Sequence, residues 1–198
     1  MTEKIRTAIF ISGRGSNMEA LINACKEEKN FPAEIKLVIA NKNAKGLIFA
    51  ESQSIKIKII SNEAFKNRLD FEQEIHQELL KNNIQLICLA GFMRILSEWF
   101  VKKWEKRIIN IHPSLLPKFK GANAVKNALI AKEKTTGCTT HFVTAEVDSG
   151  LIIKQSKVAI LSTDTEESLA TRILTQEHLI YKETLKIVAE NIINNNFN

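Results

Sequence analysis

Short apolar runs separated by polar or glycine-containing breaks recur along the first half of the chain. Runs of this length, bounded by turn-forming residues, are typical of β-strands that are buried on both faces. Such runs occupy residues 5–11, 35–40, 55–60 and 85–90, and a further one occupies residues 107–111. The pattern predicts a strand at each of these places.

The segments between these runs carry apolar residues at helical spacing, as residues 18–25 and 71–80 show. Strands that alternate with helices form right-handed βαβ units, which build a mostly parallel sheet with helices on both faces. We therefore predict an α/β fold with a doubly wound sheet.

The pattern changes in the last third of the chain. Residues 135–147 and 151–160 flank the turn-forming sequence Asp148-Ser149-Gly150, which predicts two antiparallel strands. Apolar residues at helical spacing over residues 165–189 predict a long helix. We expect a mixed sheet with an antiparallel C-terminal edge, in a single domain of residues 1–198.

Composition agrees with one globular domain, because the 198 residues are 44% hydrophobic and 25% charged. No apolar stretch approaches the ~20 residues of a transmembrane helix. The N-terminal residues also lack the features of a secretory leader. We therefore expect a cytoplasmic protein with no membrane partner.

The net charge of +6 favours an anionic partner. The lysines are scattered and not interleaved with aromatic residues, which argues against nucleic acid and leaves phosphorylated metabolites. Neither the cysteines nor three of the four histidines have metal-ligand spacing, so we predict that they are structural. These residues are Cys25, Cys88, Cys138, His76, His141 and His178.

The first candidate site is the sequence SGRGSN, residues 12–17, which follows the first predicted strand. Gly13 and Gly15 permit a tight turn, and the N-terminus of the next helix would direct N–H groups at a phosphate. A plain turn with Ser16 or Asn17 as the helix cap remains the alternative. Met18 stands where a dinucleotide-binding loop has glycine, which disfavours NAD, and no P-loop sequence is present.

The second candidate site is NIHPSLLPKFKG, residues 110–121, after the fifth predicted strand. Asn110 and His112 would leave an extended backbone on the same side. An amide donor and an imidazole suit acyl transfer, and Asp148 in a later loop would orient and charge the imidazole if the two met. The alternatives are a structural histidine and an aspartate that only begins a turn. With no G-x-S-x-G nucleophile motif, we expect direct transfer.

Five blocks of this sequence together resemble a known family. They are ISGRGSNMEALI, LAGFMRIL, NIHPSLLPKFKG, HFVTAEVDSG and TQEHLIY, in that order over nearly the whole chain. They are similar to the folate-dependent phosphoribosylglycinamide formyltransferases of the formyltransferase superfamily. The resemblance implies the formyltransferase fold and no metal. It also implies transfer of a formyl group from the cosubstrate 10-formyltetrahydrofolate to the primary amine of glycinamide ribonucleotide, in de novo purine biosynthesis.

The resemblance also implies roles for individual residues. Two positions depart from the family pattern: Arg14 often corresponds to asparagine, and the segment after Gly121 lacks a common histidine. The implied catalytic set is Asn110, His112 and Asp148; Gly15, Ser16 and Asn17 would hold the nucleotide phosphate and Glu177 the ribose; Arg68, Met93, Arg94, Ile95, Leu96, Thr144, Ala145, Glu146 and Val147, with Asn110 and Asp148, would border the folate.

Other functions remain open from the sequence. A formyltetrahydrofolate hydrolase would share the catalytic residues, and a non-enzymatic nucleotide-binding sensor would need only the phosphate site. A methionyl-tRNA formyltransferase would need a further domain to bind tRNA, so we do not expect this activity. We expect small-molecule partners and a monomer or homodimer.

Overall fold

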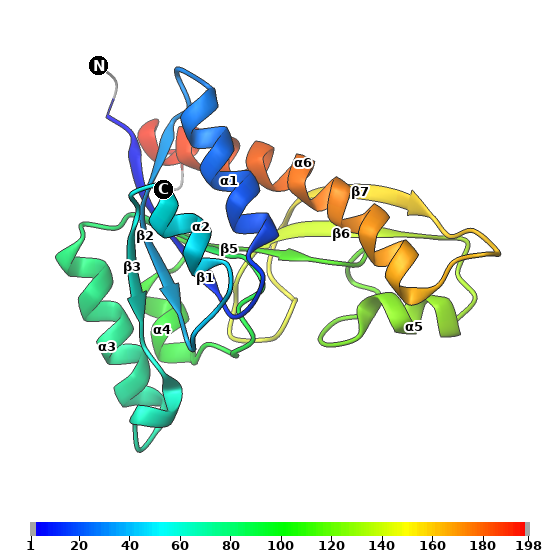
Figure 1. Cartoon of the computed structure of the whole chain (residues 1–198), viewed down its shortest axis with the longest axis horizontal. Helices are drawn as coiled ribbons and strands as arrows, with labels where there is room; N and C mark the ends of the chain where they lie inside the picture. The colour runs from blue at the N-terminus through cyan, green and yellow to red at the C-terminus, as the bar shows by residue number, and fades with distance from the viewer. Residues whose placement is uncertain (1–2, 197–198) are drawn as a thin grey trace.

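The computed structural model describes residues 3–196 and contains a seven-stranded sheet in the order β3-β2-β1-β4-β5-β6-β7 (Figure 1). The pairs among β1 to β5 are parallel, whereas β5–β6 and β6–β7 are antiparallel. The predicted mixed sheet with an antiparallel C-terminal edge is confirmed. The strands are β1 Ile5–Ile11, β2 Ala33–Ala40, β3 Lys56–Ile59, β4 Leu86–Leu89, β5 Ile108–His112, β6 Thr135–Phe142 and β7 Ile152–Ala159.

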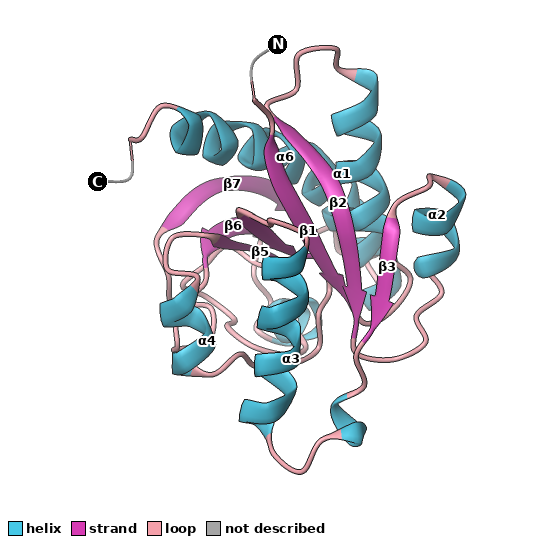
Figure 2. Ribbon diagram, turned by 90° about the vertical axis from the view of Figure 1, so that its left-hand side faces the viewer, coloured by secondary structure: helices cyan, strands magenta, loops and turns pink. Residues whose placement is uncertain are grey.

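Helices cover both faces of the sheet, as Figure 2 shows. One hydrophobic cluster joins the sheet to α1, α2, α5 and α6, and a second joins it to α3 and α4. Within the described part of the chain, no helix is both long and apolar enough to cross a membrane. The helices are α1 Ser16–Glu27, α2 Leu47–Ser52, α3 Arg68–Lys81, α4 Glu98–Lys103, α5 Ala124–Ile130 and α6 Glu166–Ile193, with a 3₁₀ turn at Asn62–Ala64.

The inner strands carry runs of apolar residues because each face of the sheet packs on its own helices. In β1, Ile9 and Ile11 lie in the cluster with α1 and α6, whereas Ala8 and Phe10 lie in the cluster with α3 and α4. Successive side chains of a strand point to opposite faces, so a sheet covered on both sides needs apolar residues at every position. This packing explains why continuous apolar runs predicted the strands correctly.

The predicted strand 135–147 is too long, because β6 ends at Phe142. In the segment that follows, the Thr144 hydroxyl donates to the Glu146 carbonyl at 3.0 Å and the Ser149 hydroxyl donates to the Val147 carbonyl at 2.9 Å. Local side-chain bonds of this kind favour turns over strand pairing. Residues 143–151 therefore form a loop, and the predicted helix 165–189 is instead the longer α6.

The carboxyl ends of β1, β4 and β5 form the edge that carries the candidate motifs. The strand order reverses between β1 and β4, which makes this edge a topological switch point of the kind where α/β proteins bind ligands. The buried hydroxyl of Tyr181 in α6 lies 2.9 Å from the Leu89 carbonyl and 3.2 Å from the Ile109 carbonyl. It thereby ties the end of β4 to the beginning of β5.

The close approach of β6 and β7 generates a first prediction, at Gly137. A Cβ at this position would lie 1.9 Å from the Ser156 carbonyl oxygen, so Gly137→Ala must force the two strands apart. We expect a loss on the order of 3 kcal/mol of unfolding free energy, measured by urea denaturation. Gly13→Ala is the matched control, because a Cβ there meets nothing within 4 Å. Equal stability of the two variants would contradict this account of the strand packing.

Candidate active site

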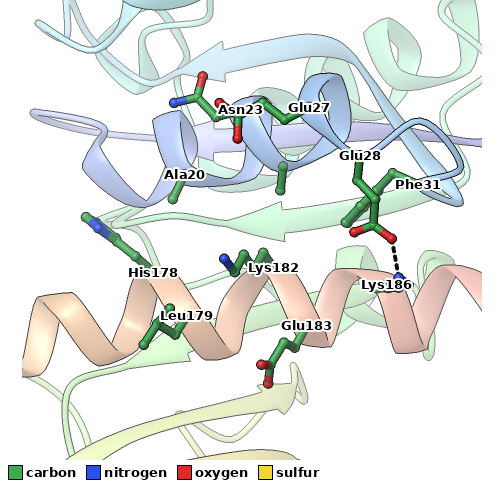
Figure 3. A pocket seen from close by; sticks show the side chains of 11 residues that line it. Ala20, Asn23, Glu27, Glu28, Phe31, His178, Leu179, Lys182, Glu183 and Lys186 are labelled. Atoms are coloured by element: carbon green, nitrogen blue, oxygen red, sulfur yellow. Dashed lines mark hydrogen bonds and ion pairs between the residues drawn. The ribbon is translucent and has the colours of Figure 1, made fainter.

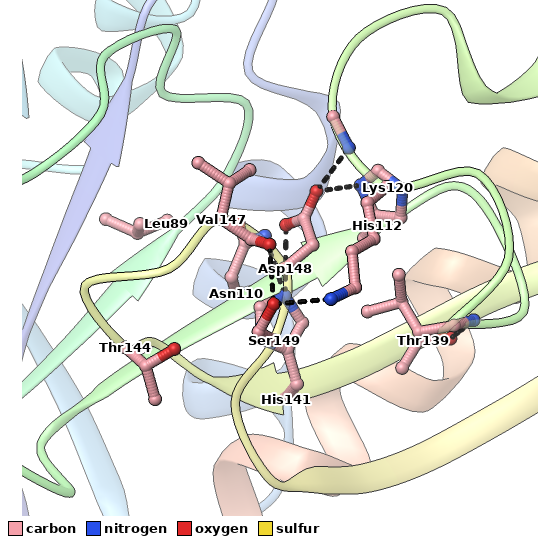
Figure 4. Close-up of polar contacts among 12 residues, drawn as sticks. Leu89, Asn110, His112, Lys120, Thr139, His141, Thr144, Val147, Asp148 and Ser149 are labelled. Atoms are coloured by element: carbon pink, nitrogen blue, oxygen red, sulfur yellow. Dashed lines mark hydrogen bonds and ion pairs between the residues drawn. The ribbon is translucent and has the colours of Figure 1, made fainter.

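The three residues of the predicted catalytic set come together at the carboxyl end of β5 (Figure 4). Asn110 and His112 both lie on β5, and Asp148 comes from the loop between β6 and β7. His112 Nδ1 is 3.3 Å from Asp148 Oδ2, and the two side chains are only 7% and 9% exposed. The structure therefore pairs the imidazole with the carboxylate in a nearly dry environment.

A second imidazole lies on the other side of this carboxylate. His141 Nε2 is 3.4 Å from Asp148 Oδ1 and 3.2 Å from Asn110 Nδ2. That His141 is structural stays a prediction, but the sequence did not indicate that its ring contacts two members of the set. The reason is the antiparallel register, which places His141 directly opposite Asn110. His76 and His178 do not contact Asp148; the His76 ring instead accepts a hydrogen bond from Trp104.

Main-chain carbonyls fix one proton on each imidazole. His112 Nε2 donates to the Phe119 carbonyl and His141 Nδ1 donates to the Phe142 carbonyl, each at 2.8 Å, because a carbonyl oxygen can only accept. The nitrogens that face Asp148 are the other ones on each ring, His112 Nδ1 and His141 Nε2.

The loop that follows His112 closes back on Asp148. The Gly121 N–H donates to Asp148 Oδ2 at 2.8 Å, and Gly121 has a φ of +74°, which glycine adopts without strain. The Ser114 hydroxyl donates to the Lys118 carbonyl at 2.6 Å, and the Thr139 hydroxyl of β6 donates to the Ser114 carbonyl at 2.6 Å. These bonds hold the Phe119 carbonyl in place against His112.

The surroundings of Asp148 favour its ionised form. Burial alone would raise the pKa of this carboxyl, but hydrogen bonds from His141 and the Gly121 N–H, with the electrostatic attraction of His112 and His141, lower it below 3.8. Within residues 3–196, no group of three or more His, Cys, Asp or Glu side chains is arranged to hold a metal ion. The arrangement is suited to holding and moving a proton.

The sequence SGRGSN lines a hollow of about 220 Å³ beside this cluster, together with Ala90, Gly91 and Met93. Gly15 has a φ of +82° and directly precedes α1, and a Cβ on it would lie 3.0 Å from Gly46 Cα. No side chain caps the N-terminus of α1, so the alternative of a Ser16 or Asn17 cap is not what the structure shows. The N–H groups of the first turn remain available to an anion.

Asn17, which lines this hollow, contacts Glu177, which is far from it in sequence. Asn17 Nδ2 donates to Glu177 Oε2 at 2.7 Å, and Asn17 Oδ1 is buried with no hydrogen-bond partner among the described residues. Burial raises the pKa of the Glu177 carboxyl, against the opposing effect of the bond from Asn17. Arg14 also lines the hollow, and its side chain is exposed.

The first segment predicted to border folate forms a loop between β4 and α4. Met93 and Ile95 are 73% and 60% exposed, Arg94 is exposed, and Leu96 is buried. The loop is joined to α3, because Arg68 Nη1 donates to the Ile95 carbonyl at 3.2 Å. An apolar surface thus faces solvent at the switch point.

The second such segment, residues 144–147, is exposed. It precedes Asp148 and is linked to the loop after β5 by Lys120, whose Nζ lies 3.3 Å from Glu146 and donates to the Ser149 hydroxyl at 2.6 Å. Its neighbour Val143 packs on the cluster that contains Phe92 of the first segment. Thr144, Ala145, Glu146 and Val147 therefore border the same end of the sheet.

A different hollow, of about 430 Å³, lies between α1 and α6 (Figure 3). Its walls carry Asn23, Glu27 and Lys182, and a Lys186–Glu28 ion pair crosses one end. None of the predicted site residues lines it. The chemistry-bearing residues instead gather at the carboxyl ends of the strands.

Comparison with known proteins gives the family. The family model described as formyl transferase matches residues 5–185. Phosphoribosylglycinamide formyltransferase of Haemophilus influenzae is 39% identical over 186 residues, which cover 93% of this chain and 87% of the relative. The crystal structure of phosphoribosylglycinamide formyltransferase from Brucella melitensis has a TM-score of 0.90 and 44% identity, over 94% of this chain and 96% of that one.

The fold and site thus place the chain in the formyl transferase class. Within that class, the chain belongs to the phosphoribosylglycinamide formyltransferase family. It is also 48% identical over 193 residues to the trifunctional purine biosynthetic protein adenosine-3 of Gallus gallus. This match covers 97% of the chain but 19% of the relative, so the chain spans about a fifth of that longer protein.

The contacts of Asp148 generate a second prediction. His141→Gln removes one hydrogen bond and one attraction that lower the pKa of Asp148, so this pKa should rise towards 3.8. A carboxyl with a lowered pKa in the folded state adds stability at neutral pH that is lost as the pH falls through that pKa. The variant should lose less stability on acidification than the wild type.

NMR titration of the carboxyl carbon measures the pKa of Asp148, and denaturation at several pH values measures the stability. His178→Gln is the control, because His178 lies in the hollow between α1 and α6. If both variants kept the wild-type pKa of Asp148, the contact with His141 would have no electrostatic effect.

Proposed function

We propose that this protein transfers the formyl group of 10-formyltetrahydrofolate directly to the primary amine of glycinamide ribonucleotide, a step of de novo purine biosynthesis. The products are formylglycinamide ribonucleotide and tetrahydrofolate. The observation that carries the proposal is the Asn110, His112 and Asp148 cluster, at the same edge of the sheet as an anion-suited hollow and two exposed loops. Membership of the family supports the choice of substrates.

The nucleotide would occupy the hollow formed by SGRGSN. Gly15, Ser16 and Asn17 would direct N–H groups of the first turn of α1 at the phosphate, where the helix dipole adds a favourable charge. Glu177 would accept hydrogen bonds from the ribose hydroxyls, with Asn17 holding its carboxylate in position. This arrangement would direct the amine of the substrate towards Asp148.

The folate would lie between the two exposed loops. Met93, Ile95 and Val147 are 73%, 60% and 39% exposed, and exposed apolar side chains beside a polar cluster suit a flat, partly apolar ring system. Arg68 at the start of α3 is an exposed cation that would attract the carboxylates of the folate tail. The residues present therefore fit the cosubstrate.

The chemistry needs one oxyanion donor and one proton carrier. As the amine forms its bond to the formyl carbon, the carbonyl oxygen gains negative charge, which an N–H of Asn110 would stabilise. The amine loses a proton, which the His112 and Asp148 pair would take up at His112 Nδ1. The same pair would return a proton to the folate nitrogen as its bond to carbon breaks.

A formyl-transfer assay tests the proposed function. The purified protein is incubated with 10-formyltetrahydrofolate, with or without glycinamide ribonucleotide, and both products are measured. We expect tetrahydrofolate to form only when the nucleotide is present. Equal release without the nucleotide would indicate a formyltetrahydrofolate hydrolase, and nucleotide binding without any release would indicate a sensor.

The role of Asn110 generates a third prediction. Asn110→Ala removes the oxyanion donor, which typically costs ~10²–10³ in kcat. Folate binding should change little, because the donor matters most when charge develops on the carbonyl oxygen. Steady-state kinetics and equilibrium folate binding measure the two effects. A variant with near-normal kcat would exclude Asn110 from this role.

The pairing of His112 with Asp148 generates a fourth prediction. Residues that act as one unit give non-additive losses, so the double variant His112→Ala with Asp148→Ala should be little slower than the more damaged single variant. We would measure the rates of formyl transfer of the wild type and the three variants as a double-mutant cycle. Melting curves would show that each variant is folded. Fully multiplicative losses would show that the two residues act independently.

A further inference from the structure

A carboxylate that the proposed chemistry does not use is completely buried in α3. Glu72 is 0% exposed, and both of its oxygens accept from one residue, Ser97. The Ser97 N–H donates to Oε1 at 2.7 Å, and the Ser97 hydroxyl donates to Oε2. No Lys, Arg or His nitrogen within residues 3–196 forms an ion pair with it. A buried carboxylate without a cation depends on such donors.

Ser97 marks the point where a loop enters α4. Its hydroxyl also accepts from the Phe100 N–H at 3.3 Å, which makes Ser97 the N-cap of this helix. The residues directly before it, 91–96, form the loop proposed above to border the folate; we call it the folate loop. Glu72 therefore fixes the outer end of the folate loop.

The inner end of the folate loop is fixed separately, by Ser12 after β1. The Ser12 N–H donates to the Gly91 carbonyl at 3.1 Å, and the Met93 N–H donates to the Ser12 hydroxyl at 2.8 Å. Between the two ends, Ile95 has one further bond, from the exposed Arg68 side chain to its carbonyl. The buried bonds at Ser97 thus restrain the outer half of the loop, together with the buried side chain of Leu96.

We propose that Glu72 is a positioning residue for the folate. By holding Ser97, its carboxylate keeps Ile95 and the outer half of the folate loop in the conformation that receives the folate. An ionised carboxylate accepts at both oxygens, whereas the amide of glutamine would turn a donor towards one of the two Ser97 donors. This inference rests on the proposed function, and its test below separates the two.

The test compares Glu72→Gln with a matched control in the same helix. Glu78 is also a buried glutamate of α3, 5% exposed, but it bonds to Lys56 at 2.7 Å and not to the folate loop. Both variants should lose stability. Only Glu72→Gln should raise the KM for 10-formyltetrahydrofolate, by ~10-fold, with the nucleotide KM within about twofold of the wild type.

Hydrogen–deuterium exchange gives a readout that does not depend on activity. Peptides that span residues 91–97 should exchange faster in Glu72→Gln and at the wild-type rate in Glu78→Gln. A purely structural role for Glu72 would lower the melting temperature but would leave both the folate KM and this local exchange at wild-type values. That result would overturn the proposal.

The remaining outcomes are also decisive. If the wild type does not transfer formyl groups, the proposed function fails. Faster exchange over residues 91–97 in Glu72→Gln would still support the anchoring of the loop by Glu72. Unchanged exchange there would overturn it. If Glu72→Gln does not fold, Ser97→Ala removes the hydroxyl from the other side of the contact. Ser97→Ala should raise the folate KM in the same selective way, and an unchanged KM would overturn the proposal.

Discussion

The site depends on the burial of one carboxylate between two imidazoles. Removing Asp148 from water is costly, and the cost is offset only if its oxygens keep strong donors. These come from separate parts of the chain: His112 on β5, His141 on β6 and the Gly121 N–H. Because each of these segments must converge on one side chain, the loop after β5 and the loop after β6 have little freedom beside the site. The carboxylate thus organises the residues that surround it.

The change from parallel to antiparallel pairing makes this convergence possible. Strands β1, β2, β3, β4 and β5 all end at the same edge of the sheet, but β6 begins elsewhere and runs back along β5. Its register sets His141 opposite Asn110 and Thr139 opposite His112. A parallel neighbour would need a crossover and would place the carboxyl end of its own strand here. The antiparallel neighbour instead supplies Thr139 and His141 from the second half of β6.

The sequence predicted what depends on local pattern. Burial on both faces gives strands such as β4 a continuous apolar run, so their positions were found, and glycines after β1 indicated the turn at Gly15. The sequence did not predict contacts that depend on strand register or that join distant segments. The role of His141 follows from its pairing across 31 residues with Asn110, and the Asn17–Glu177 contact joins residues 160 apart. The early end of β6 follows from local hydrogen bonds, and the spacing of residues in the sequence does not determine their geometry.

The two loops beside the site are held by the same kind of contact, a main-chain N–H that donates to a carboxylate. Asp148 accepts the Gly121 N–H at 2.8 Å, and Glu72 accepts the Ser97 N–H at 2.7 Å. In each case, moving the loop would leave a buried carboxylate without a main-chain donor, which costs more than breaking a neutral bond in water. The residues between the anchors, such as Met93 and Val147, are exposed and carry no such penalty. The loops are therefore anchored where they join the fold, and the side chains between the anchors are exposed to a ligand.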